Sequence, residues 1–181
     1  MFKSALRADV LLRGFLEKKL RGYYVGEIII QRNKDEMSIN IKTSRPGMII
    51  GRQGDGSDNL KKDIMNFIHK QKLDIPVNFK LDITEISSPE SNASIVAQMI
   101  AEGLEKRLPF RRVLKTTVEK SIANRDVKGI RISVSGRLGG ADMARKEQIR
   151  KGNVPLQTLR ADVDYAKEKA FMTYGTIGIK V

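Results

Sequence analysis

The sequence predicts an α+β protein made of two compact domains, each with helices packed against a β-sheet. Apolar residues recur at helical spacing in four segments and alternate at strand spacing in several others. Residues 87–92, with three serines, one asparagine and one proline, have the composition of a linker. The length of 181 residues and the 40% hydrophobic content suffice for two small cores, so we expect domains at 1–86 and 93–181.

The first domain is expected to have the element order helix, strand, strand, helix, strand. Its first helix carries an apolar stripe and ends near Gly22, a helix stop signal. The stripe consists of Leu12, Phe15, Leu16 and Leu20. A β-hairpin follows, with strands at 25–32 and 36–43 and a polar turn at 33–35.

The remaining elements of the first domain are a helix and a strand. A second apolar stripe predicts a helix over 58–72, and strict alternation predicts the strand after it. The stripe consists of Leu60, Ile64, Phe67 and Ile68. The alternating residues are Val77, Phe79, Leu81 and Ile83.

The second domain is expected to place two helices on an antiparallel sheet. A stripe from Val96 to Leu104 predicts the first helix, and Pro109 suits the first position of the second. The inner face of the second helix is expected to consist of Phe110, Val113, Leu114, Thr117 and Val118. Strands are predicted at 129–137, near Ile149, at 158–165 and at 173–181.

The composition favours a polyanionic partner. With 34 lysines and arginines against 21 acidic residues, the formal net charge is +13 and the pI is about 10.0. Nucleic acid is the first hypothesis and an acidic membrane surface the second. The absence of cysteine excludes disulfides, thiolate nucleophiles and cysteine-based zinc sites, and we expect no metal and no cofactor. No apolar run approaches the ~20 residues of a membrane span, so a soluble, cytoplasmic protein without a membrane partner is expected.

Residues 45–54, Arg-Pro-Gly-Met-Ile-Ile-Gly-Arg-Gln-Gly, lie between an alternating strand and an amphipathic helix. The glycines let the backbone come close to a sugar-phosphate chain, helix ends offer free N–H groups, and Arg52 adds positive charge. An ordinary loop would account for the glycines alone. In this context the segment resembles the GxxG loop of a type II KH domain, which holds about four nucleotides. The residues expected to bind RNA are Arg45, Gly47, Gly51, Arg52, Gln53 and Gly54.

A second candidate is a basic cluster in the helix expected after Pro109. At about 100° per residue, Arg111, Arg112 and Lys115 fall within a ~100° sector opposite the apolar face. Residues 109–151 hold 12 basic and 4 acidic residues, a net charge of +8. Residues 87–181 as a whole hold 18 basic and 10 acidic residues, which is also a net charge of +8. A solvated helix face is the alternative. The concentration of charge favours a nucleic-acid contact.

A third candidate is the glycine-rich stretch 134–145, which follows a predicted strand. It has neither the P-loop spacing nor the G-x-G-x-x-G spacing, so we expect no nucleotide pocket and no small-molecule substrate. Close backbone contact with phosphates is the hypothesis here, and a plain strand-to-loop turn is the alternative. The further RNA-contact candidates are Lys18, Lys19, Arg137, Gly139, Gly140, Arg145, Lys146, Arg150 and Lys151.

Three more segments, 135–145, 154–165 and 173–175, make the resemblance more specific. Together with the GxxG loop and the cluster after Pro109, they resemble the family of small-subunit ribosomal protein three, bacterial type, over nearly the whole chain. The resemblance implies a structural protein in the head of the small subunit, with small-subunit rRNA, mRNA and neighbouring ribosomal proteins as partners. It also implies that Arg111, Arg112 and Lys115 form a patch at the mRNA entry site that assists entry and unwinding. Most members of that family are expected to have some residues before the first helix and a short stretch after the last strand that this sequence does not contain.

Few residues suggest catalysis, and we expect no enzyme. His69 lies in the helix predicted over 58–72, where a structural or solvated histidine is expected. Asp162 and Asp164, on one face of a predicted strand, could hold a magnesium ion, but the neighbouring Arg160 and the lack of a third carboxylate favour ion pairing. The alternatives to a ribosomal protein are a metal-dependent nuclease or lyase acting on nucleic acid, and a free KH RNA-binding regulator.

Overall fold

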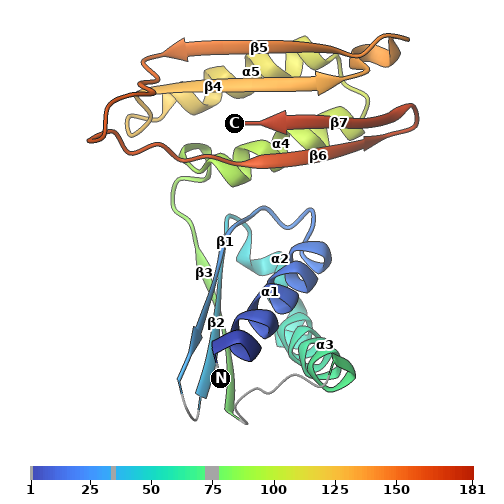
Figure 1. The fold of residues 1–181 in the computed structure, drawn as a ribbon, viewed down its shortest axis with the longest axis vertical. Helices are drawn as coiled ribbons and strands as arrows, with labels where there is room; N and C mark the ends of the chain where they lie inside the picture. The colour runs from blue at the N-terminus through green and yellow to red at the C-terminus, as the bar shows by residue number, and fades with distance from the viewer. Residues whose placement is uncertain (1, 34–35, 72–77) are drawn as a thin grey trace. The chain divides into compact units, whose positions relative to one another are not determined.

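A computed structural model describes residues 2–33, 36–71 and 78–181. The chain divides into two compact units, Met1–Ser87 and Ser88–Val181. Each unit is a β-sheet with helices on one face, which confirms the α+β class (Figure 1). The expected domain bounds at 86 and 93 stay a prediction. The segment expected as a linker contains a short 3-10 helix, η2 (Pro89–Ser91), which packs on the helices of the second unit.

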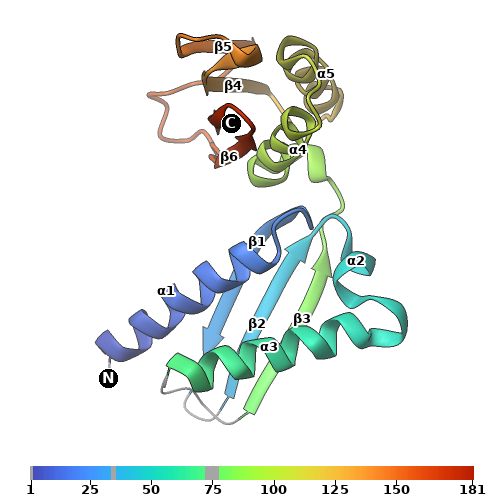
Figure 2. The ribbon, with the colours of Figure 1, turned by 90° about the vertical axis from the view of Figure 1, so that its right-hand side faces the viewer.

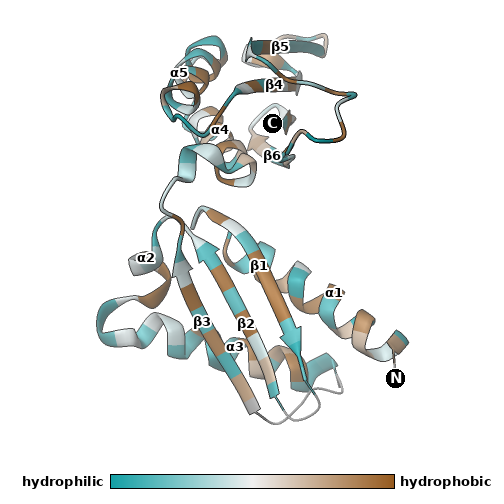
Figure 3. Cartoon of the chain, turned by 90° about the vertical axis from the view of Figure 1, so that its left-hand side faces the viewer, coloured by the Kyte–Doolittle hydropathy of each residue, from teal (hydrophilic) through white to brown (hydrophobic). Residues whose placement is uncertain are grey.

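The first unit carries its helices on one face of a three-stranded sheet. Its elements are α1 (Phe2–Lys19), β1 (Val25–Arg32), β2 (Glu36–Thr43), α2 (Pro46–Ile50), η1 (Arg52–Gly54), α3 (Asp55–Gln71) and β3 (Asn78–Glu85). The strand order is β1-β2-β3, with β2 antiparallel to β1 and parallel to β3. Helices α1 and α3 lie in front of the sheet in Figure 2 and behind it in Figure 3. The five expected elements are confirmed in their order, and α2 is an additional helix.

Alternation in β2 explains why this sheet has one buried and one open face. Met37, Ile39 and Ile41 are fully buried under the helices, whereas the residues between them face away. The helices contribute leucines and isoleucines at helical spacing to the same core. The hairpin closes where the Asn33 N–H donates to the Glu36 carbonyl at 2.8 Å, and the expected turn residues 34 and 35 lie outside the described residues.

Helix α3 begins at Asp55, three residues before the start predicted from its apolar stripe. Its first turn is polar, so periodicity gives no signal there, but acidic side chains such as Asp55 and Asp58 suit a helix N-terminus. The expected helix end at Lys72 and the expected strand residue Val77 lie outside the described residues.

The second unit places two helices on a four-stranded antiparallel sheet, as expected. Its elements after η2 are α4 (Ala93–Glu105), α5 (Phe110–Ala123), β4 (Gly129–Gly136), η3 (Leu138–Gly140), β5 (Arg145–Gly152), β6 (Lys167–Met172) and β7 (Gly175–Lys180). The strand order is β5-β4-β7-β6, and every pairing is antiparallel. In Figure 1 the sheet lies in front of α4 and α5, so both helices cover one face.

The core of this unit lies between that face and the two helices. Ile132 and Val134 from β4 and Ile179 from β7 are fully buried against α4 and α5. Helix α4 starts with an Asn92 cap, whose Oδ1 accepts from the N–H groups of Ser94 and Ile95 at 3.0 and 3.2 Å.

Two expectations for the second unit are wrong. The strand predicted at 158–165 does not form, and the strand of this region is β6, Lys167–Met172. The apolar residues of 158–165 alternate, but β6 rather than this segment pairs with β7. Leu159 and Tyr165 are accordingly 102% and 63% exposed. Pro109 is the N-cap of α5 rather than its first helical residue.

Candidate nucleic-acid interface

The GxxG segment is a sharp turn between α2 and α3. Gly51, Gln53 and Gly54 all have positive φ, at 72°, 55° and 90°. For Gln53 this left-handed conformation costs about 1 kcal/mol, because its Cβ crowds the following carbonyl. The Ser57 hydroxyl donates to the Gly54 carbonyl at 2.8 Å and ties the turn to α3.

Two glycines allow α2 and α3 to come close together. A Cβ on Gly51 would lie 2.9 Å from the Gly56 nitrogen, and one on Gly56 would lie 2.4 Å from the Ile49 carbonyl oxygen. Neither position has room for a side chain. The sequence reasoning names Gly51 but misses Gly56, whose only sequence signal is its place two residues after Gly54, the last glycine of the GxxG segment.

The surface around this turn combines apolar and charged side chains. Arg52 and Gln53 are exposed at its tip, and Met48 beside them is 53% exposed. The guanidinium of Arg45 lies 4.6 Å from the centre of the Tyr24 ring, a cation–π contact that fixes its position. Exposed apolar atoms and a fixed cation next to an open backbone suit bases and phosphates of single-stranded RNA.

The two lysines expected at the end of α1 differ in their surroundings. Lys19 Nζ lies 2.6 Å from the Asp63 carboxylate of α3, so this charge joins two helices. Lys18 is exposed and has no ion-pair partner among the described residues.

The cluster on α5 is anchored as the sequence predicts, with Val113 and Leu114 buried and all three cations exposed. Arg111 is nevertheless engaged, because it donates from Nη2 and Nε to Glu147 of β5 at 3.1 and 3.3 Å. Neither Arg112 nor Lys115 has an acidic partner in the described part of the chain. The three cations are therefore not equivalent.

Glu147 joins two of the sequence candidates that lie far apart in the chain. Its carboxylate also lies 3.6 Å from Arg145 Nε, and both guanidinium groups stand over the Phe110 ring, at 5.6 and 5.7 Å. The hydrogen bond from Arg111 lowers the pKa of Glu147, and the charges of Arg111 and Arg145 lower it further. The same hydrogen bond raises the pKa of Arg111. Sequence reasoning misses Glu147, because only the pairing of β5 in the sheet brings it to α5.

The glycine-rich stretch forms the turn between β4 and β5. Gly136, Gly139 and Gly140 have positive φ, and Leu138 between them is buried. Arg137 joins this turn to the turn between β6 and β7, because its Nε donates to the Ala141 carbonyl at 2.9 Å and its Nη1 to the Tyr174 carbonyl at 3.3 Å. These bonds give Arg137 a structural task, and its expected RNA contact stays a prediction.

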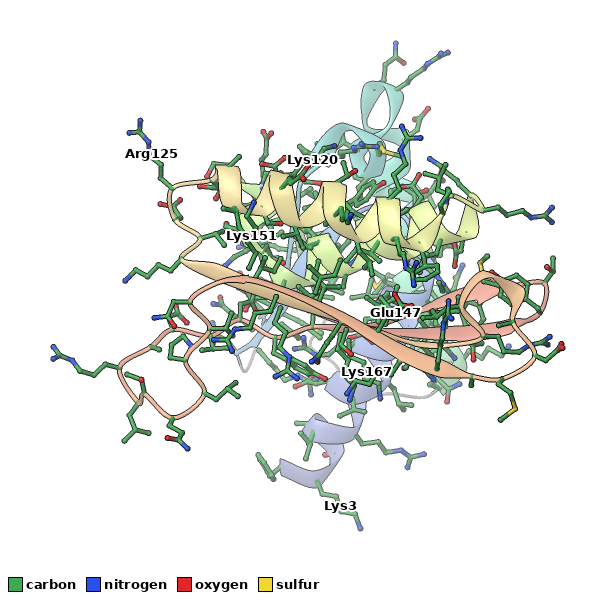
Figure 4. All side chains as sticks on the ribbon, turned by 90° about the horizontal axis from the view of Figure 1, so that it is seen from above. Lys3, Lys120, Arg125, Glu147, Lys151 and Lys167 are labelled. Carbon is green, nitrogen blue, oxygen red and sulfur yellow. The ribbon has the colours of Figure 1, made fainter. Side chains whose placement is uncertain are left out.

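The four cations of β5 do not share one side of the sheet. Register pairing puts Arg145 and Lys151 on the side of the helices and Lys146 and Arg150 on the open side. Figure 4 shows Lys151 and Glu147 on the side of β5 that faces α5. The structure thus splits a sequence cluster into two surfaces.

The residues considered for catalysis have other surroundings. Asp164 Oδ2 accepts from the Ala93 N–H at 2.7 Å, which caps the start of α4, and Asp162 and Asp164 do not lie on a strand. His69 is exposed on α3. Among the described residues, no group of three histidine or acidic side chains could hold a metal ion. No helix in the described ranges is long and apolar enough to cross a membrane.

Comparison with known proteins agrees with this architecture. Residues 11–91 match the family model of the KH domain, and residues 100–181 match that of ribosomal protein S3, C-terminal domain. The chain is 46% identical over 180 residues to small ribosomal subunit protein uS3 of Wigglesworthia glossinidia brevipalpis, covering 99% of this chain and 73% of that protein. It is 42% identical to uS3 of Clostridium acetobutylicum and 39% identical to uS3c of Rhodomonas salina, again over 99% of this chain and over 78% and 80% of those proteins.

The fold and these matches define an RNA-binding protein of the ribosome that is built on a KH domain. The chain belongs to the uS3 family of the small ribosomal subunit, which confirms the resemblance seen in the sequence. As a structural member of that subunit it binds rRNA among other ribosomal proteins, in bacteria in the cytoplasm, and it is not an enzyme. The nuclease or lyase alternative is therefore excluded.

Proposed function

We propose that this protein binds rRNA in the head of the small subunit and contacts mRNA at the entry site, assisting entry and unwinding of the message. The observation that supports the mRNA contact is the exposure of Arg112 and Lys115 and their lack of acidic partners in the part of the chain that the structure describes. Both are exposed and unpaired among the described residues, on a helix whose inner residues Val113 and Leu114 are buried. Their charges are therefore available to phosphates at a fixed spacing.

Fixed cations assist unwinding by binding rather than by hydrolysis. A backbone held at two points on a rigid helix is less free to return to a paired strand, which biases a structured message toward its single-stranded form. The sequence has no nucleotide-binding motif, so the energy comes from translocation by the ribosome. Arg111 has a different part, because Glu147 already orients and partly neutralises its guanidinium.

The test of the mRNA contact is the double variant Arg112→Gln with Lys115→Gln, in ribosomes reconstituted with this protein. We expect slower elongation through a stable mRNA hairpin and an unchanged rate on an unstructured message, because only the former needs strands held apart. The matched control is Arg111→Gln, which should have the smaller effect because this charge is already paired. Equal slowing on both messages, or failure of the double variant to enter small subunits, would assign these residues to rRNA anchoring.

The KH loop is the proposed rRNA contact of the first unit. Changing Arg52 and Gln53 to aspartate places two negative charges against phosphates, and aspartate tolerates the left-handed conformation of position 53. We expect RNA affinity to fall with little change in melting temperature. The matched control changes both residues to asparagine, which removes the positive charge without adding repulsion and should lose less affinity. Unaltered affinity in the folded aspartate variant would remove the loop from the binding surface.

A further inference from the structure

The face of the second sheet that points away from α4 and α5 is strongly cationic. Register pairing places on it every second residue of each of the four strands. We call this surface the open face of the second sheet; it consists of Arg131, Ser133, Ser135, Lys146, Gln148, Arg150, Lys167, Lys169, Phe171, Thr176, Gly178 and Lys180. Six of these twelve residues are lysine or arginine and none is acidic.

Except for Lys169, these cations have no acidic partner among the described residues. Arg131 donates from Nη2 to the Gln148 side chain at 3.0 Å, which is a neutral group. Among the described residues, neither Lys146, Arg150, Lys167 nor Lys180 lies within ion-pair distance of a carboxylate. The positive potential of these five residues is therefore not cancelled by a neighbouring carboxylate among the described residues.

Two pairs of like charges stand directly opposite each other across neighbouring strands. Arg131 pairs in register with Arg150, and Lys167 with Lys180. Like charges in directly opposed positions destabilise a sheet, so the free chain loses stability at both places. A polyanion lying on the face would remove that repulsion and so bind more favourably.

The middle of the open face is low, because its central residues are small. Ser135 on β4 and Gly178 on β7 lie side by side in register, flanked by Lys146 on β5 and Lys169 on β6. The outer two strands of this row are three strand spacings apart, roughly 14 Å. A Cβ on Gly178 would meet only atoms of Ser135, with Oγ at 3.2 Å, so the space above it is open.

We propose that the open face of the second sheet binds the phosphate backbone of folded rRNA, with the chain running over the low middle row between the flanking lysines. The inference rests on the rRNA binding of the family and adds a surface to the KH loop and α5. Backbone contact fits better than stacking of splayed bases, because the face carries one aromatic residue, Phe171, at its border. An acidic protein is the other class of partner that such charge would attract, and the test separates the two.

The test compares two triple variants that each remove three positive charges from exposed positions of the second unit. The open-face variant changes Lys146, Lys167 and Lys180 to glutamine, and the control changes Lys120, Arg125 and Lys128 to glutamine. Figure 4 labels Lys167 of the open-face variant and Lys120 and Arg125 of the control. The probe is protein-free bacterial small-subunit rRNA, with affinity measured by filter binding over a series of salt concentrations.

We expect the open-face variant to bind rRNA about tenfold more weakly, or more weakly still, at 0.1 M salt. We also expect the slope of log affinity against log salt to be smaller by about 2, since each lost phosphate contact lowers that slope by about 0.7 to 0.9. The control should change the affinity less than about threefold. Equal losses in both variants would show that only net charge matters and would overturn the proposal. Binding of rRNA as in the wild type, combined with loss from small subunits at high salt, would overturn it in favour of a protein partner.

A second variant keeps the charge and changes only the shape of the face. Gly178→Thr raises the middle row, and the Ser135 hydroxyl can rotate to accommodate the new Cβ. We expect weaker rRNA binding with an unchanged melting temperature. Unchanged affinity in the folded variant would exclude a backbone lying on the middle row. If the wild-type protein itself fails to bind rRNA, the family function fails, which is an outcome distinct from those of the variants.

Discussion

Both sheets of this molecule carry helices on one face, but they differ in the residues of the faces that the helices leave uncovered. On the first sheet that face carries Glu27, Glu36 and Asp82 together with Lys42 and Lys80. Each of these lysines is paired, Lys42 with Glu27 at 2.9 Å and Lys80 with Glu36 at 3.2 Å. The open face of the second sheet has six cations and no acidic residue.

The difference shows that fold and partner are set by different residues in each strand. The buried inward residues of both sheets are mostly aliphatic side chains that form a core, such as Ile39 and Ile41 in the first sheet and Ile132 and Ile179 in the second. The outward residues are free to vary, because they contribute little to that core. A face whose charges are mutually neutralised is suited to water, whereas a face with a surplus of cations is suited to a polyanion.

The largest effect is expected on the buried sides, where the two sheets should behave alike. Ile39→Ala in the first sheet and Ile132→Ala in the second each remove a fully buried side chain. Each should lower the free energy of unfolding of its own unit by about 2–5 kcal/mol, from lost burial and a residual cavity. Hydrogen exchange followed residue by residue measures this for each unit. A cost below 1 kcal/mol in either sheet would break the equivalence.

The next effect separates the two uncovered faces by affinity. Changing Lys42 and Lys80 to glutamine removes two charges from the first sheet, and changing Lys146 and Lys180 removes two from the second. Lys42 and Lys80 already have carboxylate partners, so we expect the first variant to lose less than about twofold in rRNA affinity. For the second variant we expect the slope of log affinity against log salt to be lower by about 1.5. Salt titrations of rRNA binding with both variants measure this difference. Indistinguishable slopes would show that the charge difference between the two uncovered faces does not affect rRNA binding.

A smaller effect tests whether the open face costs the free chain stability. Lys180→Glu turns the like-charge pair with Lys167 into an opposite-charge pair across β6 and β7. We expect the free protein to gain roughly 0.2–1 kcal/mol in unfolding free energy while its rRNA affinity falls. Urea unfolding at low salt measures the gain, and Lys180→Gln is the intermediate control. A variant that loses both stability and affinity would contradict the repulsion argument.

The smallest effect concerns Glu147, the acidic residue on the covered side of β5. Its pKa is lower in the folded chain than in the unfolded chain, chiefly through the hydrogen bond from Arg111. Its contribution to stability is therefore present above the unfolded value of about 4.3 and is lost as the pH falls through the lower folded value. The unfolding free energy of the wild type minus that of Glu147→Gln should shrink below about pH 4.3. A difference that stays constant from pH 7 to pH 3 would show that the ion pair is not formed in solution.

The sequence predicts those parts of the fold in which a period repeats over many residues. The stripes of α1 and α3 and the alternation of β2 are long enough to identify their elements. Helix α2 has five residues, too few for a period, and the alternation at 158–165 has no neighbouring strand to pair with. Pairing is a property of two segments, so one segment alone cannot reveal it.

The candidate interface divides in the same way. The GxxG turn and the cluster on α5 are local in sequence, and both lie on the elements expected for them, although their RNA contacts stay predictions. The ion pair of Arg111 with Glu147 and the open face of the second sheet depend on register between strands. Lys167 and Arg131, taken singly, look like ordinary solvated strand residues, and only their common side distinguishes them.

The strand order β5-β4-β7-β6 also has a consequence for the time at which the second unit forms during synthesis. The last strand, β7, lies inside the sheet and pairs on both sides, with β4 and with β6. Until residue 180 leaves the ribosome that makes the chain, β4 has only β5 beside it and β6 has no partner at all among these strands. The first unit has all its strands by residue 85 and can fold while the second is still being made. Nascent chains halted near residue 150 should therefore already present a folded KH domain ahead of an unfinished sheet.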